Sequence, residues 1–325
     1  MMKAQTQPAP MGIIDSLSAG FGAAAQKPGL LLVPLVLDLF LWLGPRLSIS
    51  SIVSELATRL QAMAGEMPQD SAALLEQNVS KILGDYNLFS ALSTWPLGAP
   101  SLLAGHDLGT SPLGMPPMIH VQGLNALLAW LLSLTLLGLL VGSLYLGLIA
   151  RWIEGNRVGL RAWIKLTWLY WARIVAFVLV TLVCSFFLSM LLFLIVETVV
   201  MVLAPLASLV FLAGVGMGMW GLSHLFFAVH GILLDGMKPL QAMKHSVTIV
   251  RRYRFSAVGL ILIAMIINLG LSIIWNMPPS NSWMRLAAIA GNAFSNTGLT
   301  AATFIYYRER APGSQPGDEP KPCAG

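Results

Sequence analysis

The chain has 325 residues, of which 56% are hydrophobic and only 10% are charged, and its mean hydropathy is +0.75. Soluble domains carry about 25% charged residues, so this composition excludes a soluble globular protein and indicates a polytopic membrane protein. The net charge of +5 gives no reason to expect a nucleic-acid partner, because the basic residues lie beside apolar spans and not in a soluble patch.

The two ends of the chain differ from everything between them. Residues 1–11 lack the apolar core of a cleavable signal and are expected to be disordered. The tail 311–325 is rich in Pro, Gly and charge, and we expect it to be disordered too. We therefore expect a single membrane domain over residues 12–310.

A basic amphipathic segment followed by an apolar span is the most informative pattern in this sequence. Residues 236–254 carry polar side chains at three- and four-residue steps on one helical face (Lys238, Gln241, His245, Thr248 and Arg252) and apolar ones on the other (Leu240, Met243, Val247 and Val250). This is the pattern of a helix that lies on a membrane surface, which we call an elbow. We expect further elbows at 12–26 and 151–173, the latter with Arg157, Arg161 and Lys165 spaced four apart.

Six apolar stretches are long enough to be membrane spans. They cover 29–45, 123–150, 174–196, 199–233, 255–275 and 283–307, with a tight turn at Glu197. The predicted fold is an all-α membrane protein with six transmembrane helices in three parallel two-span repeats, each preceded by a cytoplasmic interfacial helix.

The only long segment outside the spans is 46–122. It is net acidic and is predicted to form two helices followed by a Pro- and Gly-rich loop at 94–117. The other loops are basic, so the positive-inside rule places the elbows and both termini in the cytoplasm and 46–122 outside. We expect a multi-pass protein of the bacterial cytoplasmic (inner) membrane.

Asp38 is the only acidic residue inside the first span. It lies about 14 Å from the start of that span, where a charged side chain costs about 2.5–3.5 kcal/mol. His224 lies at a comparable depth in the fourth span. We hypothesise that these two side chains face each other, either as a hydrogen bond that fixes helix packing or as a proton- or ion-coupled site; the third possibility is that they do not meet.

Other polar side chains at mid-depth are amides. Asn268 is in the fifth span, and Asn292 and Asn296 are in the sixth. Hydrogen bonds between spans commonly use such residues, and a substrate-contacting cluster is the alternative.

Basic side chains beside the spans could bind anionic lipid headgroups or could only mark topology. These are Arg157, Arg161, Lys165, Lys238, Lys244, Arg251, Arg252 and Arg254.

The third elbow also carries a resemblance. Its residues Gly236–Ser246 (GMKPLQAMKHS), the basic run 251–254 and the span that follows resemble bacterial six-span membrane proteins typified by the membrane domain of glycerophosphodiester phosphodiesterases. The resemblance covers about 155–308 and implies the fold. The phosphodiesterase activity of that group lies in a separate soluble barrel, and this chain has no such barrel, so the activity is not implied.

We find no nucleophile elbow, phosphate-binding Gly loop, paired-histidine motif or close pair of carboxylates, and so expect no catalytic, cofactor or metal site. The favoured interpretation is a non-enzymatic protein with a scaffold, assembly or lipid-organising role. Its partners would be the lipid bilayer, anionic lipids and other membrane proteins. The alternative is a small proton- or ion-coupled transporter or channel that uses Asp38 and His224.

Overall fold

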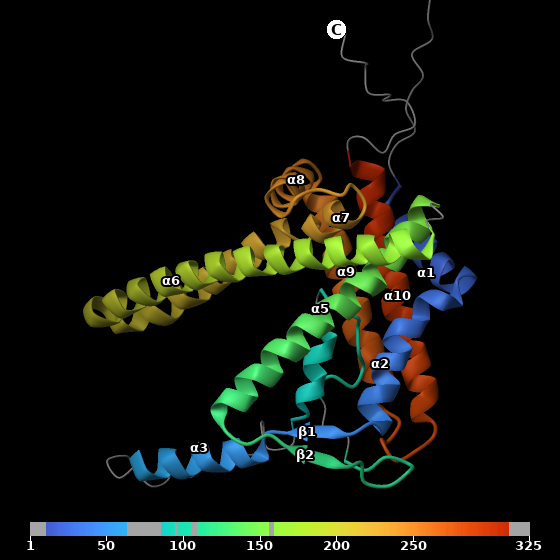
Figure 1. Cartoon of the computed structure of the whole chain (residues 1–325). Coiled ribbons are helices and arrows are strands. Elements are labelled where there is room, and N and C mark those ends of the chain that lie inside the picture. The colour runs from blue at the N-terminus through green and yellow to red at the C-terminus, as the bar shows by residue number, and fades with distance from the viewer. Residues whose placement is uncertain (1–10, 64–85, 95–96, 106–108, 156–158, 312–325) are drawn as a thin grey trace, which may run out of the picture. The chain divides into compact units, whose positions relative to one another are not determined.

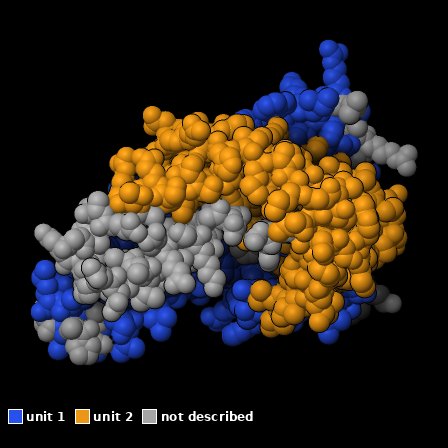
Figure 2. Space-filling view, turned by 90° about the horizontal axis from the view of Figure 1, so that it is seen from below, with its two compact units in different colours: residues 1–20, 149–265, 299–325 blue, residues 21–148, 266–298 orange. Residues whose placement is uncertain are grey.

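A computed structural model describes residues 11–63, 86–94, 97–105, 109–155 and 159–311, and in these ranges the chain is mostly helical (Figure 1). Two compact units are formed, coloured separately in Figure 2. Unit 1 comprises 1–20, 149–265 and 299–325, and unit 2 comprises 21–148 and 266–298.

The helices and strands follow one another along the chain as labelled in Figure 1. They are α1 (Ile13–Gln26), the 3-10 helix η1 (Pro28–Leu31), α2 (Leu32–Leu43), β1 (Arg46–Ser48), α3 (Ser50–Met63), the 3-10 helix η3 (Leu88–Ser93), β2 (Met118–His120), α5 (Leu124–Glu154), α6 (Leu160–His224), α7 (Ala228–Leu233), α8 (Pro239–Arg252), α9 (Arg254–Trp275) and α10 (Arg285–Arg310). The second helix predicted in the segment 46–122 covers 70–92. Its residues 70–85 lie outside the described residues, and the 3-10 helix η3 covers most of the remainder.

Four stretches of helix in the described chain are long and apolar enough to cross a membrane: Leu124–Glu154, Arg161–Met201, Ser208–Leu233 and Arg254–Trp275. A fifth is added if α1 and the helix Pro28–Leu43, which are bent by 93° relative to each other, count as one span. The protein is therefore compatible with a membrane-spanning fold. The predicted sixth span corresponds to α10, which is not among these stretches and which carries Arg285 and several polar side chains.

Two of the three predicted elbows are separate helices, and one is not. The first is α1, which ends just before Pro28, a residue that cannot continue a helix. The third is α8, which ends at Arg252 before α9 begins. The predicted second elbow is wrong as a separate element, because α6 runs from Leu160 into the following span without a break. No Gly or Pro occurs between Leu160 and Met201 to interrupt it.

The turn predicted at Glu197 is also wrong, because the helix continues past it. The only non-helical backbone inside α6 is at Leu203 (φ −146°, ψ 70°), two residues before Pro205. Beyond this break the chain returns alongside its first arm, and a Cβ placed on Gly214 would lie 2.3 Å from the side chain of Leu192 (Figure 1). The apolar side chains of both arms are exposed, as expected of surface that faces lipid.

Unit 2 also contains a small parallel sheet, which the all-α prediction did not include. In it β1 pairs with β2, with Arg46 opposite Met118 and Ser48 opposite His120. The indole nitrogen of Trp42, at the end of α2, donates a 2.8 Å hydrogen bond to the carbonyl of Ser280, which ties α2 to the turn before α10.

A loop of unit 2 packs against the middle of α5. Residues 97–104, which we call the inner loop, contain five of the buried residues of this unit, among them Leu102 and Leu103. A Cβ placed on Gly142, in the central part of the 31-residue α5, would lie 2.6 Å from the Cα of Gly98. Glycine is therefore required at position 142 for this close approach. Part of the predicted loop 94–117 thus packs against a helix long enough to span the membrane.

Candidate functional site

Asp38 is completely buried in α2, and its carboxylate is held by the inner loop. Its Oδ1 accepts hydrogen bonds from the hydroxyl of Ser101 (2.5 Å) and the backbone nitrogens of Leu102 (3.0 Å) and Leu103 (3.3 Å), and its Oδ2 accepts one from Leu102 (3.1 Å). A buried carboxylate needs such donors, because an unpaired charge in an apolar environment is very costly. Asp38 therefore anchors the inner loop.

Two of the predicted asparagines come together near this carboxylate. Asn292, on α10, interacts with Asp38, and its own side-chain oxygen accepts a 2.9 Å hydrogen bond from Asn296. Arg285, at the start of the same helix, donates to the carbonyl of Pro278 at 2.8 Å. The third predicted residue, Asn268, is half-buried on α9.

His224 does not join this cluster through any interaction that the structure gives it. It belongs to unit 1, where its Nδ1 lies 2.8 Å from the carbonyl of Trp220 in its own helix and its ring centroid lies 4.3 Å from that of the Trp220 indole, tilted by 60°. The hydrogen-bond partners of Asp38 all belong to unit 2. The proposed Asp38–His224 pair therefore gains no support, and the carboxylate has other partners.

In unit 1 the turn between α7 and α8 has a sharply defined geometry. Gly236 adopts a left-handed backbone (φ 61°), and the backbone nitrogens of Asp235 and Met237 both donate to the carbonyl of Gly231 at 3.2 Å. Glycine after a helix end and proline at the start of the next are the residues favoured at these places, and Pro239 begins α8. The turn fixes the position of Asp235.

Ser246 joins α8 to the break between α6 and α7. Its hydroxyl accepts a hydrogen bond from the backbone nitrogen of Phe227 (3.0 Å) and donates one to the carbonyl of His224 (2.6 Å). Both backbone groups would otherwise lack a partner where the helix is interrupted. It is thus the backbone of His224, and not its side chain, that has a clear structural role.

A chain of three side chains lies beside this turn. The hydroxyl of Tyr307, at the end of α10, donates a 2.5 Å hydrogen bond to Oδ2 of Asp235, and Nδ1 of His245 lies 3.0 Å from the same hydroxyl. Since the single hydroxyl proton is used toward Asp235, His245 must donate from Nδ1. The prediction that His245 belongs to the outer polar face of the elbow is wrong, because the residue is half-buried against Tyr307.

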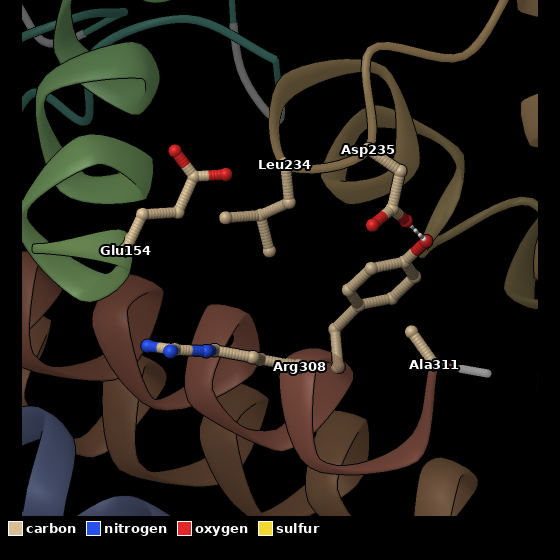
Figure 3. Close-up of a pocket in the computed structure, with 6 residues that line it drawn as sticks. Glu154, Leu234, Asp235, Arg308 and Ala311 are labelled. Atoms are coloured by element: carbon tan, nitrogen blue, oxygen red, sulfur yellow. Dashed lines mark hydrogen bonds between the residues drawn. The ribbon is translucent and has the colours of Figure 1, made fainter. Parts of the chain in front are cut away.

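These residues border a pocket of about 200 Å³ within unit 1 (Figure 3). Its lining comes from the end of α5, the α7–α8 turn and the end of α10: Glu154, Leu234, Asp235, Tyr307, Arg308 and Ala311. In Figure 3 the carboxylates of Glu154 and Asp235 lie on either side of Leu234. The guanidinium of Arg308 donates to the carbonyl of Ile153, which holds it at the end of α5.

No pattern in the sequence predicts this pocket. Its charged residues are separated by 81 and 73 positions in the chain, and no local spacing connects Glu154, Asp235 and Arg308. The one available signal was Asp235 itself, an acid directly before a helix-ending glycine in an otherwise basic segment.

The predicted lipid-contacting cations are exposed wherever the structure describes them. Arg161 and Lys165 are exposed on α6, and Lys238, Lys244, Arg251, Arg252 and Arg254 are exposed on and around α8; Arg157 lies outside the described residues. The face of α8 that is buried holds Ala242, Ser246, Ile249 and Val250. This face packs on protein. Of the predicted apolar face only Val250 is buried, whereas Leu240 is 61% exposed, so contact of that face with the membrane stays a prediction.

Among the described residues there is no group of three or more His, Cys, Asp or Glu side chains that could hold a metal ion. Comparison of the chain with models of protein families, with curated proteins and with solved structures gives no match. The resemblance to the six-span bacterial group therefore stays a prediction. Unit 1 thus has two features that could bind a ligand, which are the basic outer surface of α8 and a small pocket lined by both acidic and basic side chains.

Proposed function

We propose that the chain is a non-enzymatic protein of the bacterial cytoplasmic membrane that organises anionic lipids at the inner leaflet. The observation that carries this proposal is the exposed basic surface of α8 and the start of α9. Its five cations are Lys238, Lys244, Arg251, Arg252 and Arg254. Each cation near an anionic membrane surface contributes about 1 kcal/mol.

The proposed orientation follows from how charge divides between the two units. Unit 1 contains 14 of the 19 basic and 7 of the 14 acidic residues, a formal net charge of +7, and unit 2 therefore has −2. An excess of Lys and Arg marks the cytoplasmic side of membrane proteins. We therefore propose six spans with the basic segments of unit 1 and both termini in the cytoplasm, α10 serving as the sixth.

The packing of α8 supports a lipid-binding role over simple topology marking. Its buried face and the Ser246 hydrogen bonds hold α8 in place, so the backbone positions of the cations are set before a lipid binds. Binding of phosphate groups then orders only the side chains, whereas a flexible basic loop would also lose backbone freedom.

The experiment compares lipid composition around the protein in vesicles that contain phosphatidylglycerol and phosphatidylcholine. The fourfold variant Lys238→Gln, Lys244→Gln, Arg251→Gln and Arg252→Gln should lose most of the enrichment in phosphatidylglycerol, read from lipids retained in native mass spectrometry. The control is Lys27→Gln with Arg59→Gln, two basic residues of unit 2, which should keep it. Equal retention by both variants would refute the proposal.

The second candidate function is a small proton- or ion-coupled transporter, and it rests on Asp38 as a buried acid. The four hydrogen bonds from the inner loop favour a structural role for this carboxylate instead. Proton flux into vesicles that disappears in an Asp38→Asn variant of unchanged stability would favour the transporter.

A further inference from the structure

The pocket of unit 1 has a charge that the positive-inside rule does not explain. Two carboxylates, Glu154 and Asp235, line it beside one guanidinium, Arg308, within a unit of formal net charge +7. Carboxylates here would weaken the binding of a simple anion, and the guanidinium would weaken the binding of a simple cation. A ligand that carries both charges satisfies both kinds of group.

The carboxylate of Asp235 is held in a fixed position at the edge of the pocket. Tyr307, which is fully buried, donates to Oδ2, and the left-handed Gly236 fixes the backbone on the other side. The carboxylate of Glu154 lies across the pocket, beyond Leu234 (Figure 3). Two carboxylates on opposite sides of a small space are suited to a primary ammonium group, which has three donors.

Arg308 supplies the complementary charge. Its guanidinium is directed to the end of α5 by the hydrogen bond to Ile153. Guanidinium groups bind phosphate oxygens well because their planar donors match the geometry of the anion. The same small space therefore offers acidic groups for an amine and a basic group for a phosphate.

The size of the pocket sets the size of the group that enters it. At about 200 Å³ it is smaller than the roughly 300–1,000 Å³ of sites for drug-sized ligands. It can hold a headgroup but not an acyl chain. Leu234 and Ala311 supply apolar wall for the two methylenes that separate an amine from a phosphate in such a headgroup.

We infer that this pocket binds a zwitterionic phosphoethanolamine group, with the ammonium between Glu154 and Asp235 and the phosphate at Arg308. Its expected source is the headgroup of phosphatidylethanolamine. The inference rests on the proposed lipid-organising function and names a second lipid class for it. The basic surface of α8 would select anionic lipids, and the pocket would select this zwitterionic one.

The test uses the full-length protein in nanodiscs of phosphatidylcholine that contain a minor fraction of either phosphatidylethanolamine or phosphatidylglycerol. Lipids that stay bound are measured by native mass spectrometry. We expect phosphatidylethanolamine to be retained in preference to phosphatidylcholine, whose trimethylated nitrogen cannot donate hydrogen bonds. In Glu154→Gln this preference should fall about tenfold, because a charge-assisted hydrogen bond is lost.

The matched control is Glu309→Gln, an exposed acid one residue after Arg308 that does not line the pocket. It should keep the preference. A preference that is unchanged in Glu154→Gln would overturn the inference. Equal retention of phosphatidylethanolamine and phosphatidylcholine by the unaltered protein would exclude the lipid as the source, and would overturn the inference if free phosphoethanolamine also fails to stabilise the protein.

A further arm distinguishes the source of the ligand. Free phosphoethanolamine at millimolar concentration is added to protein in detergent, and thermal stability is measured. Stabilisation that Glu154→Gln abolishes, without any lipid preference in nanodiscs, would keep the ligand chemistry and assign it to a soluble metabolite. The proposed function is tested by a different result. If the fourfold α8 variant, which leaves the pocket intact, kept its phosphatidylglycerol enrichment, the proposed function would fail while the pocket could still bind its ligand.

Discussion

Tyr307 and Asp235 are 72 positions apart in the chain, and the hydroxyl of the first lies 2.5 Å from a carboxylate oxygen of the second. This contact joins the end of α10 to the turn that follows α7. It also orders His245, on α8, whose Nδ1 approaches the same hydroxyl at 3.0 Å. One buried phenol thus holds together three helices of unit 1 at the edge of the pocket.

Replacing Tyr307 by Phe should therefore destabilise unit 1. The variant keeps the ring but leaves Asp235 and His245 without their shared partner, at an expected cost of about 0.5–1.5 kcal/mol for each hydrogen bond. The measurement is the thermal unfolding midpoint of the purified protein in detergent, which should fall.

A suitable comparison is Tyr253→Phe in the same unit. The contacts that the structure gives Tyr253 are made by its ring, which lies 5.5 Å from the guanidinium of Arg252 and 5.6 Å from that of Arg310. This variant should unfold close to the temperature of the unaltered protein. If both variants lost the same stability, the Asp235–Tyr307–His245 arrangement would have no special role.

Asp38 should stabilise the protein through the inner loop. Asp38→Ala removes the acceptor for the buried backbone nitrogen of Leu102, and an unsatisfied buried donor costs about 1–3 kcal/mol; the nitrogen of Leu103 keeps the hydroxyl of Ser101 as an acceptor. Ser101→Ala removes one donor and leaves the carboxylate bonded to the backbone, so its loss should be smaller.

Displacement of the inner loop in Asp38→Ala can be measured directly by labelling a cysteine placed in it. Ala99 is completely buried, so a thiol introduced as Ala99→Cys should resist maleimide in the parent protein and react in combination with Asp38→Ala. Protection that persists in the double variant would show that Asp38 does not hold this loop.

Gly142 is where the inner loop approaches α5 most closely, and it should not tolerate a side chain. A methyl group would lie 2.6 Å from both the Cα of Gly98 and the carbonyl oxygen of Leu97, so Gly142→Ala should cost about 1–3 kcal/mol through displacement of the loop. Thermal unfolding measures the loss.

Gly218 provides the control in another apolar helix, because a Cβ placed there has no neighbour within 4 Å. Gly218→Ala should be neutral or slightly stabilising, since alanine restricts the unfolded chain. A loss at Gly218 equal to that at Gly142 would mean that glycine is needed for helix flexibility and not for this contact.

The sequence predicted those features that depend on local pattern. Helical periodicity located α1 and α8, and apolar length located α5, α9 and both arms of α6. The turn was predicted at Glu197 because charge interrupts the apolar run there, but Glu is a good helix former. The helix breaks at Leu203 instead, because Pro205 cannot continue it.

Contacts between distant segments could not be obtained in this way. A charged carboxylate in an apolar span costs free energy, so the sequence predicts that Asp38 needs a hydrogen-bond partner. It does not predict which one, because the partners lie 63 to 65 positions away in a loop without periodicity. The residues around the pocket come from three helix ends, so no single stretch of sequence brings them together. Periodicity likewise could not tell that α8 packs on protein through a face that contains Ala242 and Ser246.

The proposed orientation predicts that α8 and α3 are reached from opposite sides of the membrane. The positive-inside rule assigns α8 to the cytoplasm and the acidic segment that contains α3 to the outside. In a background of Cys184→Ser and Cys323→Ser, the exposed positions Thr248 and Ser54 are each changed to Cys. A membrane-impermeant maleimide added to spheroplasts should label Ser54→Cys alone, and added to inverted vesicles it should label Thr248→Cys alone. Cys184, exposed on an apolar arm of α6, should resist the reagent from both sides when it is the only thiol, because it faces lipid. Labelling of both introduced thiols from one side would contradict the six-span orientation, since the basic and acidic segments would then lie on the same side of the membrane.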